Sequence, residues 1–103
     1  MPQVIYTADA LEDLIRLHQF LRDKSETAAD KARGEIRSGI ARIAQAPMGH
    51  RPVDGHPTLR DLVVRFGANG YIVRYHYRPG GDIVILRIRH QREAGFDNDL
   101  DRS

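Results

Sequence analysis

The residues best suited to chemistry are four arginines and one histidine in the second half of the sequence. They are Arg60, Arg87, Arg89, Arg92 and His90. A guanidinium presents five N–H donors in a planar fork that matches a phosphate or a carboxylate. An imidazole gains and loses a proton near neutral pH. The set could therefore bind a phosphate and supply one acid or base, but the second proton-transfer group that general acid–base catalysis needs is not evident.

His90 also has a structural interpretation. It follows Val84, Leu86 and Ile88 at every second position, and this alternation predicts that all four side chains face the core. A histidine at the end of such a stripe often closes a sheet through hydrogen bonds. The sequence favours this role over a direct one in function.

The arginines also have more than one possible role. Three of them alternate near the end of the last predicted strand and form the best candidate contact patch: Arg87, Arg89 and Arg92. The alternative is a solvated sheet face. Replacing all three with alanine is expected to lower activity more than stability, because polar surface substitutions change stability by about 0.5 kcal/mol or less. Arg60 either binds the target or a phosphate, or pairs with Asp61, Asp82 or a carboxylate near the end of the sequence.

Charge is distributed unevenly along the 103 residues, whose formal net charge is +2. Residues 1–50 hold seven basic and seven acidic side chains, and residues 51–92 hold eight arginines against three aspartates. Residues 93–103 hold four acids against Arg102. An excess of arginine favours an acidic partner or a nucleic acid. A general preference of the source genome for arginine over lysine is an equal alternative.

Length and composition bound the class of protein. The 103 residues make one domain. No cysteine is present, which excludes disulfides and thiolate metal sites. His50 and His56 share a loop, but their spacing suits no common metal site, so neither a metal nor a cofactor is expected. The sequence has no signal peptide and no apolar run of about 20 residues, which predicts a cytoplasmic protein outside the membrane.

Two helices are predicted in the first half. The first begins after Thr7, an N-cap, and carries an apolar stripe at three- and four-residue steps. The stripe consists of Leu11, Leu14, Ile15, His18 and Leu21. The second helix is expected to open with a Thr27–Asp30 capping pair and to end before Pro47. Small residues such as Gly39 predict a close approach to the first helix.

Strands account for most of the remainder. A short strand at Gln3–Tyr6 precedes the helices, and a loop at residues 47–57 follows them. Three further strands are predicted: Leu59–Phe66, Tyr71–Tyr77 and Ile83–His90. Their short turns predict an antiparallel meander, so the expected architecture is α+β, with a long helical hairpin packed on this meander. We expect one domain over residues 1–97, with residues 98–103 frayed.

This order of elements, β-α-α-β-β-β, resembles that of the ParE/RelE toxin superfamily. Four segments strengthen the resemblance. Ile43–Arg51 resembles the family's exit from the second helix, an apolar residue followed by Pro and then Gly-x-Arg. Leu59–Leu62 looks like its arginine-bearing second strand and Tyr71–Tyr75 like its aromatic third strand. Ile85–Arg92 is similar to its final strand with the His-x-Arg ending, so the resemblance extends from Val4 to Arg92.

The resemblance implies the toxin of a type II toxin–antitoxin system, of the kind that stabilises plasmids. RelE-like members cut messenger RNA on the ribosome, whereas ParE-like members inhibit DNA gyrase by binding. Two long helices and an acidic segment after His90 favour the ParE branch. Gyrase is then the target and Arg60, Arg87, Arg89 and Arg92 are the target-binding candidates, without enzymatic activity. The alternative is an endoribonuclease that uses Arg60, His90 and Arg92.

Leu17 and Phe20 lie outside the apolar stripe of the first helix. A helix that is apolar on more than one side must be buried on more than one side. The resemblance implies that the cover is a cognate antitoxin segment, folded onto the toxin as an amphipathic helix in a groove. The alternative is that both side chains pack beneath the loop at residues 47–57.

Overall fold

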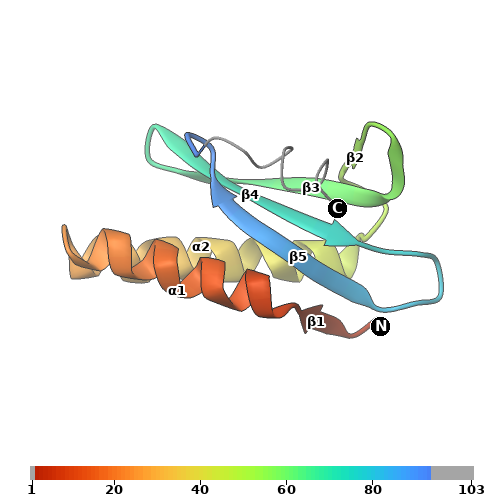
Figure 1. Cartoon of the computed structure of the whole chain (residues 1–103), viewed down its shortest axis with the longest axis horizontal. Helices are drawn as coiled ribbons and strands as arrows, with labels where there is room; N and C mark the ends of the chain where they lie inside the picture. The colour runs from red at the N-terminus through yellow and green to blue at the C-terminus, as the bar shows by residue number, and fades with distance from the viewer. Residues whose placement is uncertain (1, 94–103) are drawn as a thin grey trace.

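The computed structural model describes residues 2–93, which form two helices packed on one side of a five-stranded sheet (Figure 1). The elements in chain order are β1 Val4–Tyr6, α1 Ala8–Arg22, α2 Glu26–Gln45, β2 Arg51–Val53, β3 His56–Phe66, β4 Asn69–His76 and β5 Ile83–His90. The sheet order is β1-β5-β4-β3-β2. The predicted α+β fold, with its helical hairpin and its meander of β3, β4 and β5, is confirmed. The predicted boundary between residues 97 and 98 lies outside the described residues.

The sheet is wider than predicted. The segment at residues 47–57 was expected to be a loop, but it contains β2, which pairs antiparallel with β3. Gly55 adopts a φ of 78°, a left-handed conformation that lets the chain turn sharply between the two strands. Pro52 cannot donate to a ladder, and it is accommodated because β2 is an edge strand. Pro52 therefore favoured the prediction of a loop, although a strand at the edge of a sheet can accommodate a proline.

The two helices begin at side-chain caps. The Thr7 hydroxyl accepts a hydrogen bond from the amide of Ala10 at 3.1 Å, which confirms the first predicted cap. The second prediction is wrong, since α2 begins at Glu26 and its cap is Ser25, whose hydroxyl accepts from the amide of Ala28 at 3.1 Å. Serine caps a helix as well as threonine does, and the earlier start lengthens α2.

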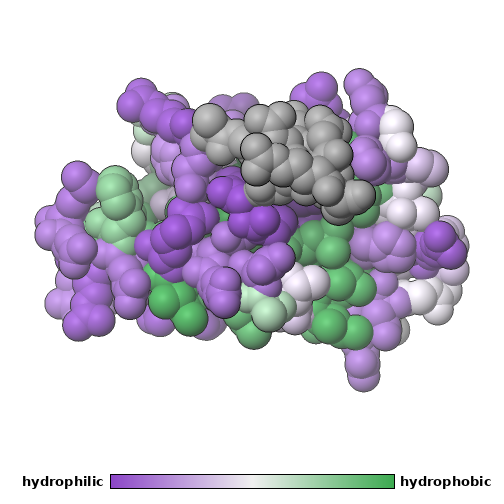
Figure 2. Space-filling model, in the orientation of Figure 1, coloured by the Kyte–Doolittle hydropathy of each residue, from purple (hydrophilic) through white to green (hydrophobic). Residues whose placement is uncertain are grey.

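The buried face of α1 differs from the predicted stripe. Leu11 and Ile15 are exposed, whereas Ala10, Asp13 and Leu17 are buried. In Figure 2 green, hydrophobic residues accordingly reach the surface along the lower side of the molecule, where α1 and β1 lie. The prediction failed because one of the positions that face inward is an acid. Counting apolar residues alone therefore assigned the wrong face of the helix to the core.

A β-bulge changes the register of β5. Arg74 of β4 faces Arg87, but the next residue, Tyr75, faces Ile85, so Leu86 is the extra residue. The bulge places Ile83, Ile85 and Ile88 in the core and leaves Val84 and Leu86 only partly buried. The prediction that Val84 and Leu86 share the core face of Ile88 is therefore wrong. A bulge inserts one residue into the alternation, and period-two patterns do not reveal it.

Gly39 of α2 allows a close approach, but to β3 rather than to the first helix. A Cβ atom built on Gly39 would lie 2.8 Å from Cγ2 of Val64 and 2.9 Å from Cδ2 of Leu62. The expectation that Gly39 packs against α1 is corrected accordingly. The helix approaches the sheet so closely at this point that a methyl group has no room.

Two glycines of α2 should respond oppositely to alanine. Gly39→Ala is expected to lower the free energy of unfolding by about 1–3 kcal/mol, because it overpacks the core. Gly34→Ala, whose Cβ would meet no atom within 4 Å, is expected to raise it by about 1 kcal/mol through helix propensity. Urea denaturation of both variants checks this prediction. A stabilised Gly39→Ala variant would contradict the close packing.

Candidate functional site

The side of the sheet that faces away from the helices carries most of the candidate arginines. We call it the open face; in the described residues it includes Asp61, Val63, Arg65, Ile72, Arg74, Arg87 and Arg89. At its centre the Arg74 guanidinium binds the Asp61 carboxylate through two hydrogen bonds of 2.7 and 2.8 Å. Asp61, Arg74 and Arg87 lie side by side on adjacent strands. The other arginines on this face give it a positive charge.

Arg87 joins this face to α1 through a buried acid. Its Nε donates to Oδ2 of Asp13 at 2.9 Å, and the amide of Ile88 donates to the same oxygen at 2.8 Å. Asp13 is only 3% exposed. Because β1 ends at Tyr6, the Asp13 side chain occupies the edge of β5 that β1 leaves uncovered. Arg87 therefore has a structural role that its sequence position did not indicate.

Several hydrogen bonds stabilise the ionised form of Asp13. Burial alone would raise its pKa, but bonds from Arg87, from the amide of Ile88 and from Arg16 outweigh burial, so the pKa lies below the ordinary value. Asp13 was not among the candidate residues predicted from the sequence. The available signal was its spacing, three residues after Ala10 and four before Leu17, which places the carboxylate on the buried face.

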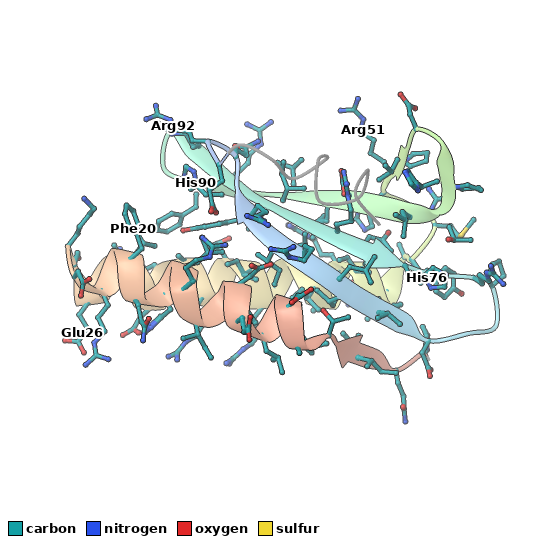
Figure 3. All side chains as sticks on the ribbon, in the orientation of Figure 1. Phe20, Glu26, Arg51, His76, His90 and Arg92 are labelled. Carbon is teal, nitrogen blue, oxygen red and sulfur yellow. The ribbon has the colours of Figure 1, made fainter. Side chains whose placement is uncertain are left out.

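This contact changes the expectation for the three arginines at the end of β5. Arg87 is not a solvated surface residue, so its removal is expected to lower stability. Arg89 lies on the open face opposite Ile72. Arg92 is exposed just beyond β5, at the same end of the molecule as His90 (Figure 3). Arg89 and Arg92 remain the contact candidates whose replacement leaves the bonds from Arg87 and Ile88 to Asp13 in place.

His90 closes the end of β5. Its Nδ1 accepts a hydrogen bond from the amide of Arg92 at 3.1 Å, and its own amide donates to Oε1 of Glu93 at 2.9 Å. Its ring packs edge-on against Tyr71, with the ring centroids 5.5 Å apart. These contacts agree with the structural role that the sequence favoured for His90.

Arg60 lies on the helix-facing side of the sheet, apart from the other candidates. It is paired with Tyr75 of β4, whereas His90 is paired with Tyr71, about 13 Å further along that strand. Its Nη1 donates to the carbonyl oxygen of His50 at 2.7 Å, so Arg60 holds the segment between α2 and β2. Of the acids considered as its partner, Asp61 binds Arg74 and Asp82 accepts from the amide of Gln3. The aspartates near the end of the sequence lie outside the described residues.

Tyr75 holds the same segment. Its buried hydroxyl donates to the carbonyl oxygen of Pro47 at 2.6 Å, and burial raises the pKa of Tyr75 to about 12. Tyr71 and Tyr75 of this strand both belong to the buried core. Arg60, His90 and Arg92 are thus not assembled into a single constellation.

Leu17 and Phe20 have different environments. Leu17 is 7% exposed and belongs to the core, whereas Phe20 is 62% exposed. Both line a hollow of about 650 Å³ beside the β3–β4 turn, together with Phe66, Tyr71 and His90. In Figure 3, Phe20 lies at the end of the molecule that carries His90 and Arg92, opposite the end with Arg51 and His76. The alternative that both pack beneath residues 47–57 is therefore wrong.

Charged side chains surround this hollow. Nη1 of Arg16 lies 2.6 Å from Oε2 of Glu93, and this ion pair, together with Arg92, lines the hollow. Nζ of Lys24 lies 5.0 Å from the centre of the Phe20 ring. An apolar hollow with a basic surround suits an amphipathic segment that carries acids beside its apolar residues. Neither helix within residues 2–93 is long and apolar enough to cross a membrane.

Comparisons with known proteins agree with this fold. The family model described as "ParE toxin of type II toxin-antitoxin system, parDE" matches residues 4–95. Toxin RelE3 of Caulobacter vibrioides is 38% identical over 85 residues, which cover 82% of this chain and 88% of the relative. Toxin RelE2 of the same organism is 33% identical over 90 residues, which cover 87% of this chain and 96% of the relative.

A solved structure gives the same architecture. The chromosomal ParDE toxin–antitoxin system of P. aeruginosa contains a chain that matches with a TM-score of 0.73 at 22% identity. The match covers 87% of this chain and 96% of that one. The resemblance predicted from the residues is therefore confirmed. This chain belongs to the ParE toxin family of type II toxin–antitoxin systems.

Proposed function

We propose that this toxin acts in the cytoplasm by binding DNA gyrase and inhibiting it, without a cofactor and without covalent chemistry. A cognate antitoxin neutralises it, as in a system that stabilises a plasmid. The separation of Arg60 from His90 carries the proposal, because a ribonuclease would need its phosphate-binding and proton-transfer groups around one bond. A surface that inhibits by binding needs no such convergence.

The contacts of the candidate residues support the same proposal. The Arg60 guanidinium is engaged with His50, and Nδ1 of His90 is engaged with the amide of Arg92. Arg92 is exposed just beyond β5, and Arg89 lies near it on the open face of the sheet. We assign them to the surface that meets the target, whose complementary groups are carboxylates or phosphates.

A second function is favoured by the relatives' names. The toxins RelE3 and RelE2 of C. vibrioides carry the name of the ribonuclease branch. In that alternative the chain cuts messenger RNA on the ribosome, with Arg92 and His90 at the phosphate and Arg60 remote from it. Such a toxin would act as an enzyme.

The antitoxin is proposed to bind at the hollow beside Phe20. An aromatic ring that is more than half exposed beside an apolar hollow has much surface to lose to a partner. Acidic residues on the bound segment would meet Arg16, Lys24 and Arg92. Leu17 supports this site from the core and contributes less contact area than the sequence suggested.

Expression of the toxin alone should separate the two functions in cells. Gyrase inhibition is expected to give filamented cells with an induced DNA-damage response, while protein synthesis continues at first. Microscopy, a damage-response reporter and pulse labelling of new protein measure the three effects. Arrest of translation within minutes, without the damage response, would support the ribonuclease alternative.

The contact role of Arg89 and Arg92 is tested by changing both to alanine. We expect the inhibitory concentration against gyrase to rise about tenfold or more, equal to about 1.4 kcal/mol of binding free energy. Stability should change by about 1 kcal/mol at most, since neither substitution touches Asp13. The control is Arg22→Ala with Arg78→Ala, which removes the same charge from exposed positions elsewhere. Equal inhibition by both double variants would show that Arg89 and Arg92 are not part of the surface that contacts the target.

A further inference from the structure

The first helix is apolar on a side that its own fold leaves open. Leu11 is 48% exposed and Ile15 is 59% exposed, although both side chains are large and apolar. They lie one turn apart on α1, so they are neighbours on the same face. Ala10 and Leu17, on the opposite side of the helix, pack in the core. A helix that is apolar on two sides is normally buried on both, so the face of Leu11 and Ile15 calls for a partner.

The outward positions of α1 have the spacing of a seam between two helices. Ala8, Leu11, Ile15, His18 and Arg22 recur at alternating steps of three and four residues. All are exposed except His18, whose side chain is 27% exposed. This is the repeat with which two helices pack side by side. We call these five positions the outer seam.

The charges along the outer seam divide by sign. Asp9 and Glu12 are exposed in the first half of α1, whereas Arg16 and Arg22 are exposed in the second half. An antiparallel copy of α1 would bring the acidic half of each helix to the basic half of the other. A parallel copy would bring like charges together, which is unfavourable. Antiparallel packing also opposes the two helix dipoles. The outer seam is therefore complementary to itself, unlike the hollow beside Phe20 with its basic surround.

We propose that two copies of the chain associate through their outer seams, packed antiparallel about a two-fold axis near Ile15. The 15 residues of α1 are about 22 Å long. The contact is therefore smaller than the about 1,200 Å² of a stable interface, and the expected Kd is of the order of 10–100 µM. Phe20 lies about 140° around the helix from Ile15, so the hollow stays open in the dimer. The association does not rest on the proposed function.

A register centred close to Ile15 suits both the apolar and the charged positions of the outer seam. Ile15 would meet Ile15 and His18 of the second copy. Leu11 would lie against the apolar stem of Arg22 from the second copy, and Glu12 would lie within reach of the same guanidinium. Because a two-fold interface uses the same surface twice, every such contact occurs in duplicate.

Sedimentation equilibrium of the full chain, from well below to well above the expected Kd, measures the association. Leu11→Gln with Ile15→Gln should raise the Kd about tenfold or more and leave Tm nearly unchanged, because both side chains are exposed. The matched control is Met48→Gln with Val63→Gln, which are 53% and 49% exposed in other elements. The control should associate as the parent does.

Charge reversal tests the antiparallel packing. Glu12→Arg alone and Arg22→Glu alone should each weaken association about fivefold, since each turns two attractive contacts into repulsive ones. The two changes combined should restore the parent Kd, because the pairs form again with their signs exchanged. Glu35→Arg makes the same change in net charge as Glu12→Arg, on the exposed side of α2, and is the control. Parallel packing would give no such restoration.

Cross-linking gives a measurement that does not depend on the folding of the glutamine variants. The sequence lacks cysteine, so Ile15→Cys carries a single thiol close to the proposed axis. A short bifunctional thiol reagent should link two copies of this variant, and should link far fewer copies of Met48→Cys.

Several results would overturn the proposal. They are a chain that stays monomeric at every concentration, association that survives loss of Leu11 and Ile15, and equal cross-linking of the two cysteine variants. Failure of the combined charge reversal to restore association would overturn the antiparallel packing. A monomeric chain whose Leu11→Gln, Ile15→Gln variant also binds the antitoxin more weakly than the control would assign the outer seam to the antitoxin instead.

Discussion

Replacing Asp13 with alanine is expected to lower the free energy of unfolding by about 3–5 kcal/mol, the usual cost of breaking a buried ion pair. The change removes the acceptor of both the Arg87 guanidinium and the Ile88 amide, at the point where α1 meets the uncovered edge of β5. A domain of this size is stable by only about 5–15 kcal/mol. The loss should lower Tm by about 10 °C or more.

Denaturation in urea measures this effect, with Glu12→Ala as the control, because Glu12 is an exposed acid on the same helix. The control should lose about 0.5 kcal/mol or less. Asp13→Asn keeps an acceptor for the Ile88 amide but loses the charge, so we expect an intermediate loss. A loss below about 1 kcal/mol for Asp13→Ala would show that the buried carboxylate does not fasten α1 to the sheet.

The same variant should reveal a dependence on pH. The folded-state pKa of Asp13 lies below the unfolded value of about 3.9. Its contribution to stability is therefore fully present above about pH 4 and is lost as the pH falls through the folded-state pKa. The stability advantage of the parent over Asp13→Ala should shrink below about pH 4. An advantage that grew on acidification would contradict the lowered pKa.

The second large effect is expected at Phe20. Phe20→Ala should weaken antitoxin binding about 30-fold or more, equal to about 2 kcal/mol, as for a central aromatic anchor of an interface. It should change the free energy of unfolding by only about 0.5 kcal/mol, because the ring is already exposed in the free toxin. Titration calorimetry with the antitoxin, together with thermal melting, measures both quantities.

Leu17→Ala provides the matched comparison on the same helix. Leu17 lies in the core, so its truncation should cost about 2–5 kcal/mol of stability. Binding measured well below its Tm should fall less than for Phe20→Ala. Unchanged antitoxin affinity in Phe20→Ala would show that the antitoxin does not bind at this hollow. A large fall in Tm for that variant would instead assign Phe20 to the fold.

Much of the fold followed from local patterns. The Thr7 cap, the end of α2 before Pro47 and the turns between β3, β4 and β5 each depend on residues adjacent in sequence, and the structure confirms them. The predictions were wrong where residues distant in sequence determine the local structure. Leu86 is extruded as a bulge because of its register with β4, and no residue near it in sequence indicates this.

The candidate site was predicted less completely, for the same reason. Sequence alone grouped Arg60 with Arg87 and Arg89, but strand pairing places Arg60 on the other side of the sheet. The role of Asp13 depends on the end of β1, which leaves the Ile88 amide without a strand partner on that edge. Leu17 and Phe20 were predicted as one pair, although the helix turns one into the core and the other outward.

The supercoiling of a relaxed plasmid by purified DNA gyrase and ATP, with increasing amounts of the purified toxin, tests the central claim most directly. The account predicts that supercoiling falls as toxin is added and returns when the cognate antitoxin is added in equal amount. An Arg60→Ala variant that still folds should inhibit supercoiling as well as the parent does. Translating ribosomes given the same toxin should keep their messenger RNA intact. Full supercoiling at every toxin concentration, together with cleaved messenger RNA on the ribosomes, would contradict the account and identify the toxin as a ribonuclease.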